Sequence, residues 1–504
     1  RLIGRGDEGT VTARVARNSI APIALNLFNR GIDFAFALVM LRVLGPEGSG
    51  IYTYVVVIFG WFDIVTNFGL NLYLIRETAR DRTKAAFLLA NTSALRLGLV
   101  GLCIPLVLAF VGARQSLIAD PLSAEALTAL ALLYIGLIPG TINTGLAALF
   151  YGFERIEVPS AVATLTTIIG AVMRLGALLL GFGVVGLAAV SIAANLITLA
   201  ALAWTARSLL AAGLRGAAVR LDVMRRMVTE SAPLMLNHLL ATIFFQIDIV
   251  LIEAFHGERM VGQYGVAYKW LLALNIIPSF FTQAMLPVMS RQARENRDGF
   301  RRAYLFSIKL LLTLAIPVAV IFTFAAETLT AILGGAAFLP DGAIATQLMI
   351  WSIPIGWMNS LTQYALVALD MQRRITWAFV AAVGFNIVTN LIFVPQYGYQ
   401  AAAITTILSE LVLFIFFARL MVIGIGSVSW FRVTWRAGAA GALMIGSAAL
   451  ASMLHPLIGL VIGCGVYAAA VIGLRVFSSE EIERGVTLLP VRVREPIRRA
   501  LRTA

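Results

Sequence analysis

The chain has 504 residues, of which 60% are hydrophobic and only 13% are charged, and its mean hydropathy is +0.89. This composition excludes an ordinary soluble globular protein and predicts a chain whose main solvent is lipid. The formal net charge of +13 raises nucleic-acid binding, but the Lys and Arg residues lie in short connections between apolar blocks and form no nucleic-acid-binding module.

The apolar blocks are each long enough to cross a hydrocarbon core roughly 30 Å thick. Helices are the expected element, because lipid provides no hydrogen-bond partners for exposed backbone groups. We therefore predict an all-α polytopic membrane protein with about 14 transmembrane helices. In chain order, the predicted spans are 18–44, 51–75, 86–112, 126–152, 158–181, 184–210, 231–255, 262–287, 303–325, 343–369, 374–395, 399–422, 432–453 and 456–477.

Basic residues are concentrated in alternate connections between these spans. They cluster at 76–84 (RETARDRTK), 207–226, 291–302 (RQARENRDGFRR) and from 475 onward, whereas the turn at 45–50 (GPEGSG) carries no basic residue. Because positively charged loops stay in the cytoplasm, this asymmetry predicts that both termini are cytoplasmic.

Weak internal repetition indicates that the chain contains a duplicated half. A first shift of the sequence against itself, which places Gly45 on Gly257, also aligns Gly50 and Tyr52 with Gly262 and Tyr264. A second shift, which places Gly183 on Gly398, also aligns Ala188 and Asn195 with Ala403 and Glu410. Each half holds six predicted spans, an even number, so the two repeats should have the same orientation in the membrane.

The spans and repeats together predict the domain organisation. It comprises a cytoplasmic segment at 1–17, an N-lobe at 18–210, a basic linker at 211–230, a C-lobe at 231–422, two further spans within 432–477 and a basic cytoplasmic tail at 478–504.

Several turns and helix ends also carry a resemblance to a known family. The stretches are 44–54 (LGPEGSGIYTY), 68–80 (FGLNLYLIRETAR), 246–249 (QIDI), 261–270 (VGQYGVAYKW) and 395–410 (PQYGYQAAAITTILSE). They resemble the polysaccharide transporter family, the O-antigen or lipid-linked oligosaccharide flippases of the multidrug/oligosaccharidyl-lipid/polysaccharide (MOP) exporter superfamily. The resemblance covers roughly residues 18–422 and continues in the last two spans.

The resemblance implies a function as well as a fold. It implies two six-helix lobes of the MATE type around a central cavity that opens alternately to either side. The implied cargo is an undecaprenyl-pyrophosphate-linked oligosaccharide, moved from the inner to the outer leaflet of a bacterial or archaeal cytoplasmic membrane. The expected partners are this lipid-linked oligosaccharide and membrane lipids, with a polysaccharide polymerase and glycosyltransferases as further candidates and no nucleic acid.

A polar face in the first span is the first candidate site. Asn26, Asn29, Arg30 and Asp33 follow the spacing i, i+3, i+4, i+7 and so share one side of a helix. A charge inside the bilayer costs about 2.5–3.5 kcal/mol on insertion scales, so this face should look into the bundle or a wet cavity. The alternative is an Arg30–Asp33 pair that neutralises itself between helices.

Three further cations lie within spans: Arg96 in the third, Arg174 in the fifth and Lys269 in the eighth. Together with Arg30, they are predicted to bind an anionic pyrophosphate, because the guanidinium fork suits phosphate oxygens. The alternatives are snorkelling toward an interface and pairing with a carboxylate such as Asp63.

Four carboxylates are candidates for coupling to an ion or for charge pairing: Asp33, Asp63, Asp248 and Glu410. A static ion pair with Lys269 would explain Asp248 equally well. No cofactor is expected, and the energy source would be H+, Na+ or the membrane potential.

Polar and aromatic side chains within spans predict a path for the sugar. They are Asn26, Asn29, Tyr264, Tyr268, Asn275, Asn359 and Gln363. Sugars are bound by hydroxyl and amide groups beside aromatic faces. Polar stripes also hold helices together in membranes, which is the alternative explanation.

The sequence has no phosphate-binding glycine loop ending in Lys-Ser/Thr, no HExxH, no GxSxG and no CxxC pair. Neither catalysis nor a metal site is therefore expected. Other functions stay open: a cation antiporter of the MATE type, a lipid II flippase, or a polysaccharide synthase or ligase subunit that holds its lipid-linked sugar without moving it. The mid-span cations favour an anionic cargo over an organic cation.

Overall fold

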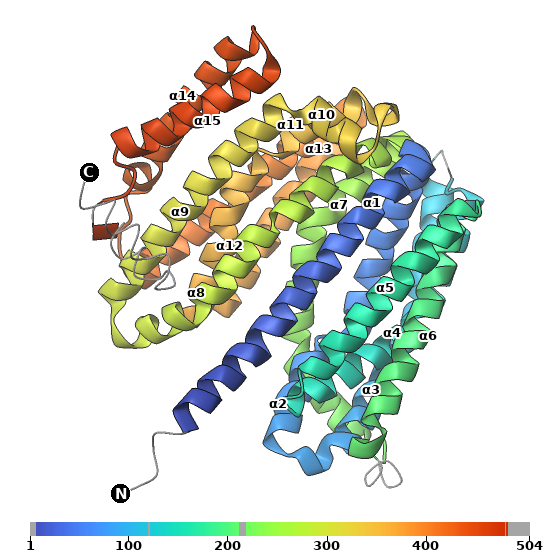
Figure 1. The fold of residues 1–504 in the computed structure, drawn as a ribbon. Helices are drawn as coiled ribbons and strands as arrows, with labels where there is room; N and C mark the ends of the chain where they lie inside the picture. Colours follow the sequence, from blue (N-terminus) through green and yellow to red (C-terminus); the bar gives the residue numbers. More distant parts are fainter. Residues whose placement is uncertain (1–6, 119–120, 211–217, 479, 482–504) are drawn as a thin grey trace, which may run out of the picture. The chain divides into compact units, whose positions relative to one another are not determined.

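The computed structural model describes residues 7–118, 121–210, 218–478 and 480–481, and every regular element in these ranges is helical (Figure 1). The α-helices are α1 (Asp7–Asn67), α2 (Leu70–Arg80), α3 (Ala85–Leu117), α4 (Ala124–Gly152), α5 (Glu157–Leu179), α6 (Gly183–Leu210), α7 (Leu221–Leu274), α8 (Ile276–Glu295), α9 (Arg297–Phe324), α10 (Ala326–Leu333), α11 (Asp341–Met349), α12 (Ser352–Ala368), α13 (Gln372–Ile425), α14 (Trp430–Ser452) and α15 (Pro456–Gly473). The short 3-10 helices are η1 (Arg82–Lys84) and η3 (Ala336–Phe338).

Nine helical stretches within the described residues are long and apolar enough to cross a membrane. Three of them, Ala24–Arg80, Leu221–Glu295 and Gln372–Ile425, each hold two predicted spans, so the nine stretches contain twelve of the predicted fourteen. The remaining two predicted spans correspond to α11 with α12 and to α14. The predicted all-α polytopic membrane fold is therefore confirmed, and fourteen spans fit its helices.

Parts of the predicted organisation lie outside the described residues. These parts are 1–6 of the predicted N-terminal segment, 119–120 of the predicted N-lobe, 211–217 of the predicted linker, and 479 and 482–504 of the predicted tail. Helix α1 begins at Asp7 and therefore includes most of the segment expected to precede the first span.

Three long helices contain a kink at a glycine with positive φ: Gly45 in α1 (φ 65°), Gly257 in α7 (φ 78°) and Gly398 in α13 (φ 56°). Glycine adopts this backbone region without steric cost. Gly45 and Gly257 are paired by the first shift, and Gly183, the partner of Gly398 in the second shift, has φ 54°. At Gly45, Gly257 and Gly398, two predicted spans are therefore joined by a kink at one residue and not by a loop. The similar φ angles of the paired glycines support the predicted duplication.

Two predicted spans contain a helix break that the hydropathy pattern does not reveal. The span 262–287 is divided at Asn275, between α7 and α8, and the span 343–369 is divided between α11 and α12. A proline lies in the first turn of each second helix, at Pro278 and Pro354. Because proline has no N–H to donate to the carbonyl four residues earlier, the helix is interrupted at that point.

The described chain groups into two compact units. Unit 1 contains 1–269, 331–341 and 387–402, and unit 2 contains 270–330, 342–386 and 403–504. These bounds group spatial contacts and do not test where one repeat ends, so the predicted lobe boundaries stay predictions.

In unit 1, the kinked turns of α1 and α7 touch backbone to backbone. A side chain at Gly50 would overlap the carbonyl oxygen of Glu258, and one at Gly262 would overlap the carbonyl oxygen of Pro46. The first shift, which aligns Gly50 with Gly262, also aligns Pro46 with Glu258. The glycine of each turn therefore packs against a backbone carbonyl of the other turn, at equivalent positions of the two repeats. Glycine permits this close approach because it has no side chain.

The helices of unit 1 pack α4 against α6, and α1 against both α4 and α5 (Figure 1). Its core includes the fully buried side chains of Leu70, Leu74, Leu149 and Ala206. Lipid tails are as apolar as these side chains, so close packing and interhelical hydrogen bonds stabilise the contacts.

In unit 2, α9 packs against α8, α12 and α14. Helices α14 and α15 run side by side as the predicted pair of additional spans (Figure 1). Their contact depends on small residues, because side chains at Gly459 or Gly463 would crowd Ala448 and Ser452 of α14.

Candidate functional site

The polar face predicted in the first span lies on α1, and cations from two other helices of unit 1 approach it. Nη2 of Arg174, on α5, lies 3.2 Å from Oδ1 of Asp33. Lys269, on α7, lies within electrostatic reach of Asp33. Arg30 lies one turn before Asp33 on α1. We call these four residues the Asp33 cluster.

The Asp33 cluster is partly accessible. The side chain of Asp33 is 57% exposed within the described residues, and that of Arg174 is 22% exposed. The Arg174 guanidinium lies 4.6 Å from the ring centroid of Phe36, a favourable cation–π arrangement. Arg30 donates from Nε to Oδ1 of Asn26 at 3.1 Å. Asp33 thus pairs with Arg174 in place of the Arg30 partner considered from sequence.

Arg96, the fourth predicted cation, has a different environment. Its side chain is fully buried, with Nη1 donating to the Thr141 carbonyl at 3.0 Å and Nη2 donating to Asn71. Asp63 lies within electrostatic reach of Arg96 and accepts a hydrogen bond of 2.8 Å from Asn67. Arg96 therefore belongs to a buried polar network between α1, α2, α3 and α4.

Asp248 is buried in unit 1 and joins the two arms of the kinked helix α7. Its Oδ2 accepts a hydrogen bond from the Tyr264 hydroxyl, and its Oδ1 accepts one from the backbone N–H of Ile249 at 2.9 Å. Asp248 precedes the kink at Gly257 and Tyr264 follows it. The ring centroids of Tyr264 and Tyr268 are 5.7 Å apart.

Glu410, on α13, is buried in unit 2 beside Asn359 of α12. Nδ2 of Asn359 donates to Oε2 of Glu410 at 2.6 Å and to its backbone carbonyl at 2.8 Å. Gly356, one turn earlier on α12, leaves space for the carboxylate, since a Cβ there would be 3.2 Å from Oε1 of Glu410. We call Gly356, Asn359 and Glu410 the second asparagine clamp.

A similar set of residues lies between α4 and α6 in unit 1. Nδ2 of Asn143 donates to the backbone carbonyl of Asn195 at 2.9 Å, and Nδ2 of Asn195 donates to the carbonyl of Gly136 at 3.1 Å. Gly140, one turn before Asn143, leaves space for the Asn195 amide, since a Cβ there would be 3.5 Å from Nδ2. We call Gly140, Asn143 and Asn195 the first asparagine clamp.

The two clamps occupy equivalent positions in the repeats. The second shift of the sequence against itself aligns Asn195 with Glu410. A shift that is longer by one residue aligns Asn143 with Asn359. In both clamps, the Oδ1 of the donating asparagine is buried and has no hydrogen-bond partner among the described residues. The two halves thus share one polar helix contact, built with an amide in one and a carboxylate in the other.

The remaining residues of the predicted sugar path are spread over both units. Within unit 2, Oδ1 of Asn275 accepts from Nε1 of Trp357 at 3.0 Å, and Gln363 is half-buried on α12. Within unit 1, Asn29 is half-buried on α1. Several of these side chains bond to neighbouring residues, which fits the helix-packing alternative, and the sugar path stays a prediction.

Sequence reasoning overlooked a buried ion pair in unit 1. Nη2 of Arg114, on α3, lies 2.6 Å from Oε1 of Glu253 on α7, and its Nε lies 3.1 Å from Oε2. Both side chains are buried. A signal existed, because Glu253 lies in the last turn of the predicted span 231–255 and Arg114 directly follows the span 86–112, at ends predicted to share one side of the membrane.

Among the described residues, no group of three or more His, Cys, Asp or Glu side chains could hold a metal ion. The absence of a cofactor stays a prediction.

The sequence matches the profile of the polysaccharide biosynthesis protein family over residues 15–293, and that of the MatE family over residues 233–392. No curated protein matches the chain.

Several solved membrane transporters have a similar fold. Lipid II flippase MurJ, in an inward closed conformation, has a TM-score of 0.71 at 14% identity, covering 91% of this chain and 99% of that one. An inward-facing multidrug resistance MATE transporter has a TM-score of 0.62 at 17% identity, covering 81% and 94%. A MOP superfamily transporter from Pyrococcus furiosus, whose binding pocket of reverse polarity suggests a different function, has a TM-score of 0.53 at 16% identity, covering 82% and 96%. These likenesses confirm the MATE-like fold.

Proposed function

Because the chain belongs to the polysaccharide biosynthesis protein family, within the MOP exporter superfamily, we propose that it is a flippase for an anionic lipid-linked oligosaccharide. The cargo carries an undecaprenyl-pyrophosphate anchor and moves from the inner to the outer leaflet of the cytoplasmic membrane by alternating access. The Asp33 cluster is the observation that carries this choice of cargo.

The charge of the Asp33 cluster supports an anionic cargo. Arg30, Arg174 and Lys269 are three basic side chains from three helices of unit 1, and the cluster has the single carboxylate of Asp33. A pyrophosphate offers negative charge and many acceptor oxygens, which Arg binds through charge-assisted hydrogen bonds. We infer that Asp33 holds Arg174 in position when the site is empty and that a pyrophosphate competes with Asp33 for it.

The buried carboxylates Asp248 and Glu410 are the proposed sites of ion coupling. Each accepts a hydrogen bond from a neutral donor side chain, Tyr264 or Asn359, which can hydrogen-bond to the carboxylate in either protonation state. Binding or release of a proton or Na+ at such a site would change a buried charge at a helix contact. Asp63 is a weaker candidate, because it already lies within reach of Arg96.

A cation antiporter of the MATE type is the second candidate, favoured by the MatE match at 233–392 and by the exposed carboxylate of Asp33. Lipid II, another anionic lipid-linked sugar, and a subunit that holds its lipid-linked sugar without moving it are further alternatives. They differ from the proposed function in cargo or in the absence of transport, and one assay can separate them.

The test is transport in proteoliposomes that contain the purified chain. A labelled undecaprenyl-pyrophosphate oligosaccharide is placed in one leaflet, and its appearance in the other is followed after Arg30→Ala or Lys269→Ala. Each variant should abolish flipping while the folded yield and detergent melting temperature stay unchanged. Arg155→Ala is the matched control, because this exposed cation of unit 1 lies outside the Asp33 cluster.

Two further arms separate the alternatives. Lipid II is supplied in place of the oligosaccharide, and a fluorescent organic cation is supplied to test antiport. Unchanged flipping in both the Arg30 and Lys269 variants would refute the cationic site, and export of the organic cation without flipping of the lipid would favour the MATE-type function. Binding of the lipid-linked sugar without flipping would favour the non-transporting subunit.

A further inference from the structure

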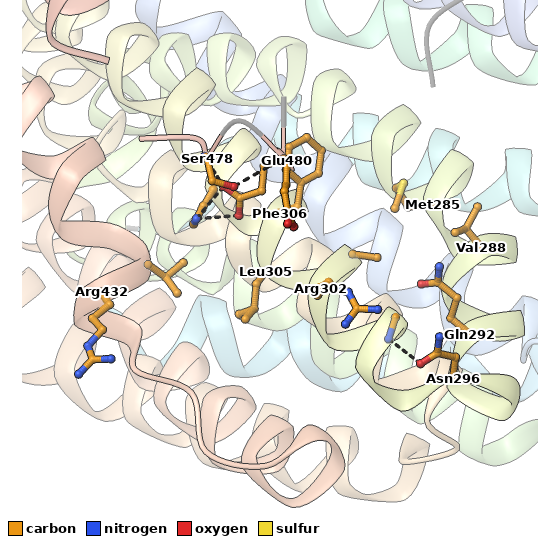
Figure 2. A pocket seen from close by; sticks show the side chains of 15 residues that line it. Met285, Val288, Gln292, Asn296, Arg302, Leu305, Phe306, Arg432, Ser478 and Glu480 are labelled. Carbon is orange, nitrogen blue, oxygen red and sulfur yellow. Dashed lines mark hydrogen bonds and ion pairs between the residues drawn. The ribbon is translucent and has the colours of Figure 1, made fainter. Parts of the chain in front are cut away.

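Unit 2 contains a cavity of about 620 Å³ that the proposed transport site does not use. It lies between the end of α8, the first turns of α9 and α14, and three residues beyond α15, which are Ser478, Glu480 and Glu481 (Figure 2). The basic connection 291–302 borders it, which places it at the predicted cytoplasmic ends of these helices.

One face of α9 forms a wall of this pocket. Arg302, Leu305, Phe306 and Lys309 follow the spacing i, i+3, i+4, i+7, and all four line the cavity. The two cations are separated by about 10 Å along the helix axis, with an apolar surface between them. Figure 2 shows Arg302 near Gln292, with Leu305 between Arg302 and Arg432 in the view.

The structure contains a bound carboxylate at one of these cations. Both oxygens of Glu481 contact Nζ of Lys309, at 2.7 and 3.0 Å, and one also accepts the backbone N–H of Ser478 at 2.8 Å. Lys309 is thus presented as a site for a two-oxygen anion, and Glu481 occupies it from within the chain.

Two further cations line the pocket, Arg302 and Arg432. Neither Arg302 nor Arg432 has a hydrogen bond or ion pair to another described residue, and both side chains are exposed. Oε1 of Gln292 is buried without a partner among the described residues. The pocket therefore offers two unpaired guanidinium groups in addition to the occupied ammonium.

We propose that this pocket binds the headgroup phosphate of an anionic membrane phospholipid, and that the lipid phosphate displaces Glu481 from Lys309. Arg302 and Arg432 donate to the phosphate oxygens, and the acyl chains lie over the apolar surface. Apolar side chains of the lining, among them Met285, Val288, Leu305 and Phe306, favour a lipid over a free inorganic anion, which would leave that surface uncovered.

The test measures lipid binding to the full chain in a neutral detergent. Short-chain phosphatidylglycerol, short-chain phosphatidylcholine and inorganic phosphate are titrated separately, and bound ligand is counted by native mass spectrometry. Phosphatidylglycerol should bind more tightly than the other two. A cation near an anionic lipid contributes about fivefold in affinity, so Arg302→Gln with Arg432→Gln should weaken phosphatidylglycerol binding about 30-fold.

The test also includes a matched control and a variant that is expected to raise the affinity. Arg291→Gln with Arg294→Gln removes the same charge from exposed positions outside the pocket lining and should change affinity less than twofold. Glu481→Gln should tighten binding several-fold, because it removes the internal competitor for Lys309. Equal binding of phosphatidylcholine, equal loss in the control, or weaker binding after Glu481→Gln would each overturn the proposal. None of these residues belongs to the Asp33 cluster. Failure of the lipid-binding proposal would therefore leave the proposed flippase function intact.

Discussion

The first and second asparagine clamps have the same architecture in the two halves of the chain but different chemistry. In each, an asparagine on one helix donates Nδ2 to a backbone carbonyl of a second helix, at 2.9 Å in the first clamp and 2.8 Å in the second. The residue that provides this carbonyl is Asn195 in the first clamp and Glu410 in the second. The first clamp therefore has a fixed charge state, whereas the second can gain or lose a proton.

This difference shows which part of the helix contact is shared by the two halves and which part varies. The helix contact itself needs only the asparagine amide and a carbonyl, which both halves retain. The position beside it is free to vary because a glycine, Gly140 or Gly356, leaves space for its side chain. The second clamp has an ionisable side chain, Glu410, at this position, and the asparagine bond to the backbone carbonyl still joins the two helices.

The largest predicted effect is the loss of the donor in the second clamp. Asn359→Leu removes both bonds to Glu410 and leaves a buried carboxylate without its partner, so unfolding should become easier by about 3 kcal/mol. Asn143→Leu removes one neutral interhelical bond and should cost about 0.6 kcal/mol. Chemical unfolding of both variants in detergent measures the difference. Equal losses would mean that the charge of Glu410 adds nothing to the clamp.

Glu410→Gln converts the second clamp into a neutral one like the first. The glutamine carbonyl can still accept from Asn359, so the fold should be retained, but no proton or cation can be exchanged. Gradient-driven flipping in proteoliposomes should fall about tenfold, equivalent to about 1.4 kcal/mol. Unchanged acceleration by an imposed proton or Na+ gradient would remove Glu410 from the coupling mechanism.

Asn195→Asp makes the reverse change in the first clamp. The Asn195 amide donates to the carbonyl of Gly136, and a carboxylate would place an acceptor against that carbonyl. We expect a loss of about 1 kcal/mol in the free energy of unfolding, because one hydrogen bond is lost and a polar group is left unsatisfied. A variant that is as stable as the parent chain would show that the first clamp tolerates charge as readily as the second.

The smallest predicted effects come from the glycines. In a helix, alanine is more favourable than glycine by about 1 kcal/mol. A Cβ at Gly140 would be in ordinary contact with Asn195 at 3.5 Å, whereas one at Gly356 would be crowded at 3.2 Å from Glu410. Gly140→Ala should therefore leave the stability unchanged or raise it slightly. Gly356→Ala should not raise the stability, and it should slow flipping a few-fold. Melting temperature and flipping rate, measured for both variants, test this order.

Features with a regular spacing could be predicted from the sequence. Hydropathy located the spans, and the first shift of the sequence against itself paired Gly45 with Gly257, which have φ angles of 65° and 78°. The helical period placed Arg30 and Asp33 on one face of α1 without any structural information. These predictions succeed because each depends on neighbouring residues or on a repeated pattern.

Contacts between distant residues could not be predicted in the same way. Asp33 pairs with Arg174, 141 residues away, and Glu253 pairs with Arg114, 139 residues away. Such pairs depend on which helices are neighbours and on how each is rotated about its axis, which hydropathy does not encode. Lys309 is a further example, because its partner Glu481 lies beyond α15.

The reciprocal contact between the turns of α1 and α7 has the form of an isologous interface. In a twofold homodimer, residue i of one subunit contacts residue j of the other, and j contacts i in return. Gly50 against Glu258 and Gly262 against Pro46 follow this rule within one polypeptide. In a homodimer, one substitution at that glycine would change both contacts at once. In a single polypeptide each glycine mutates separately, so the two turns can diverge in sequence while the backbone contact still depends on both.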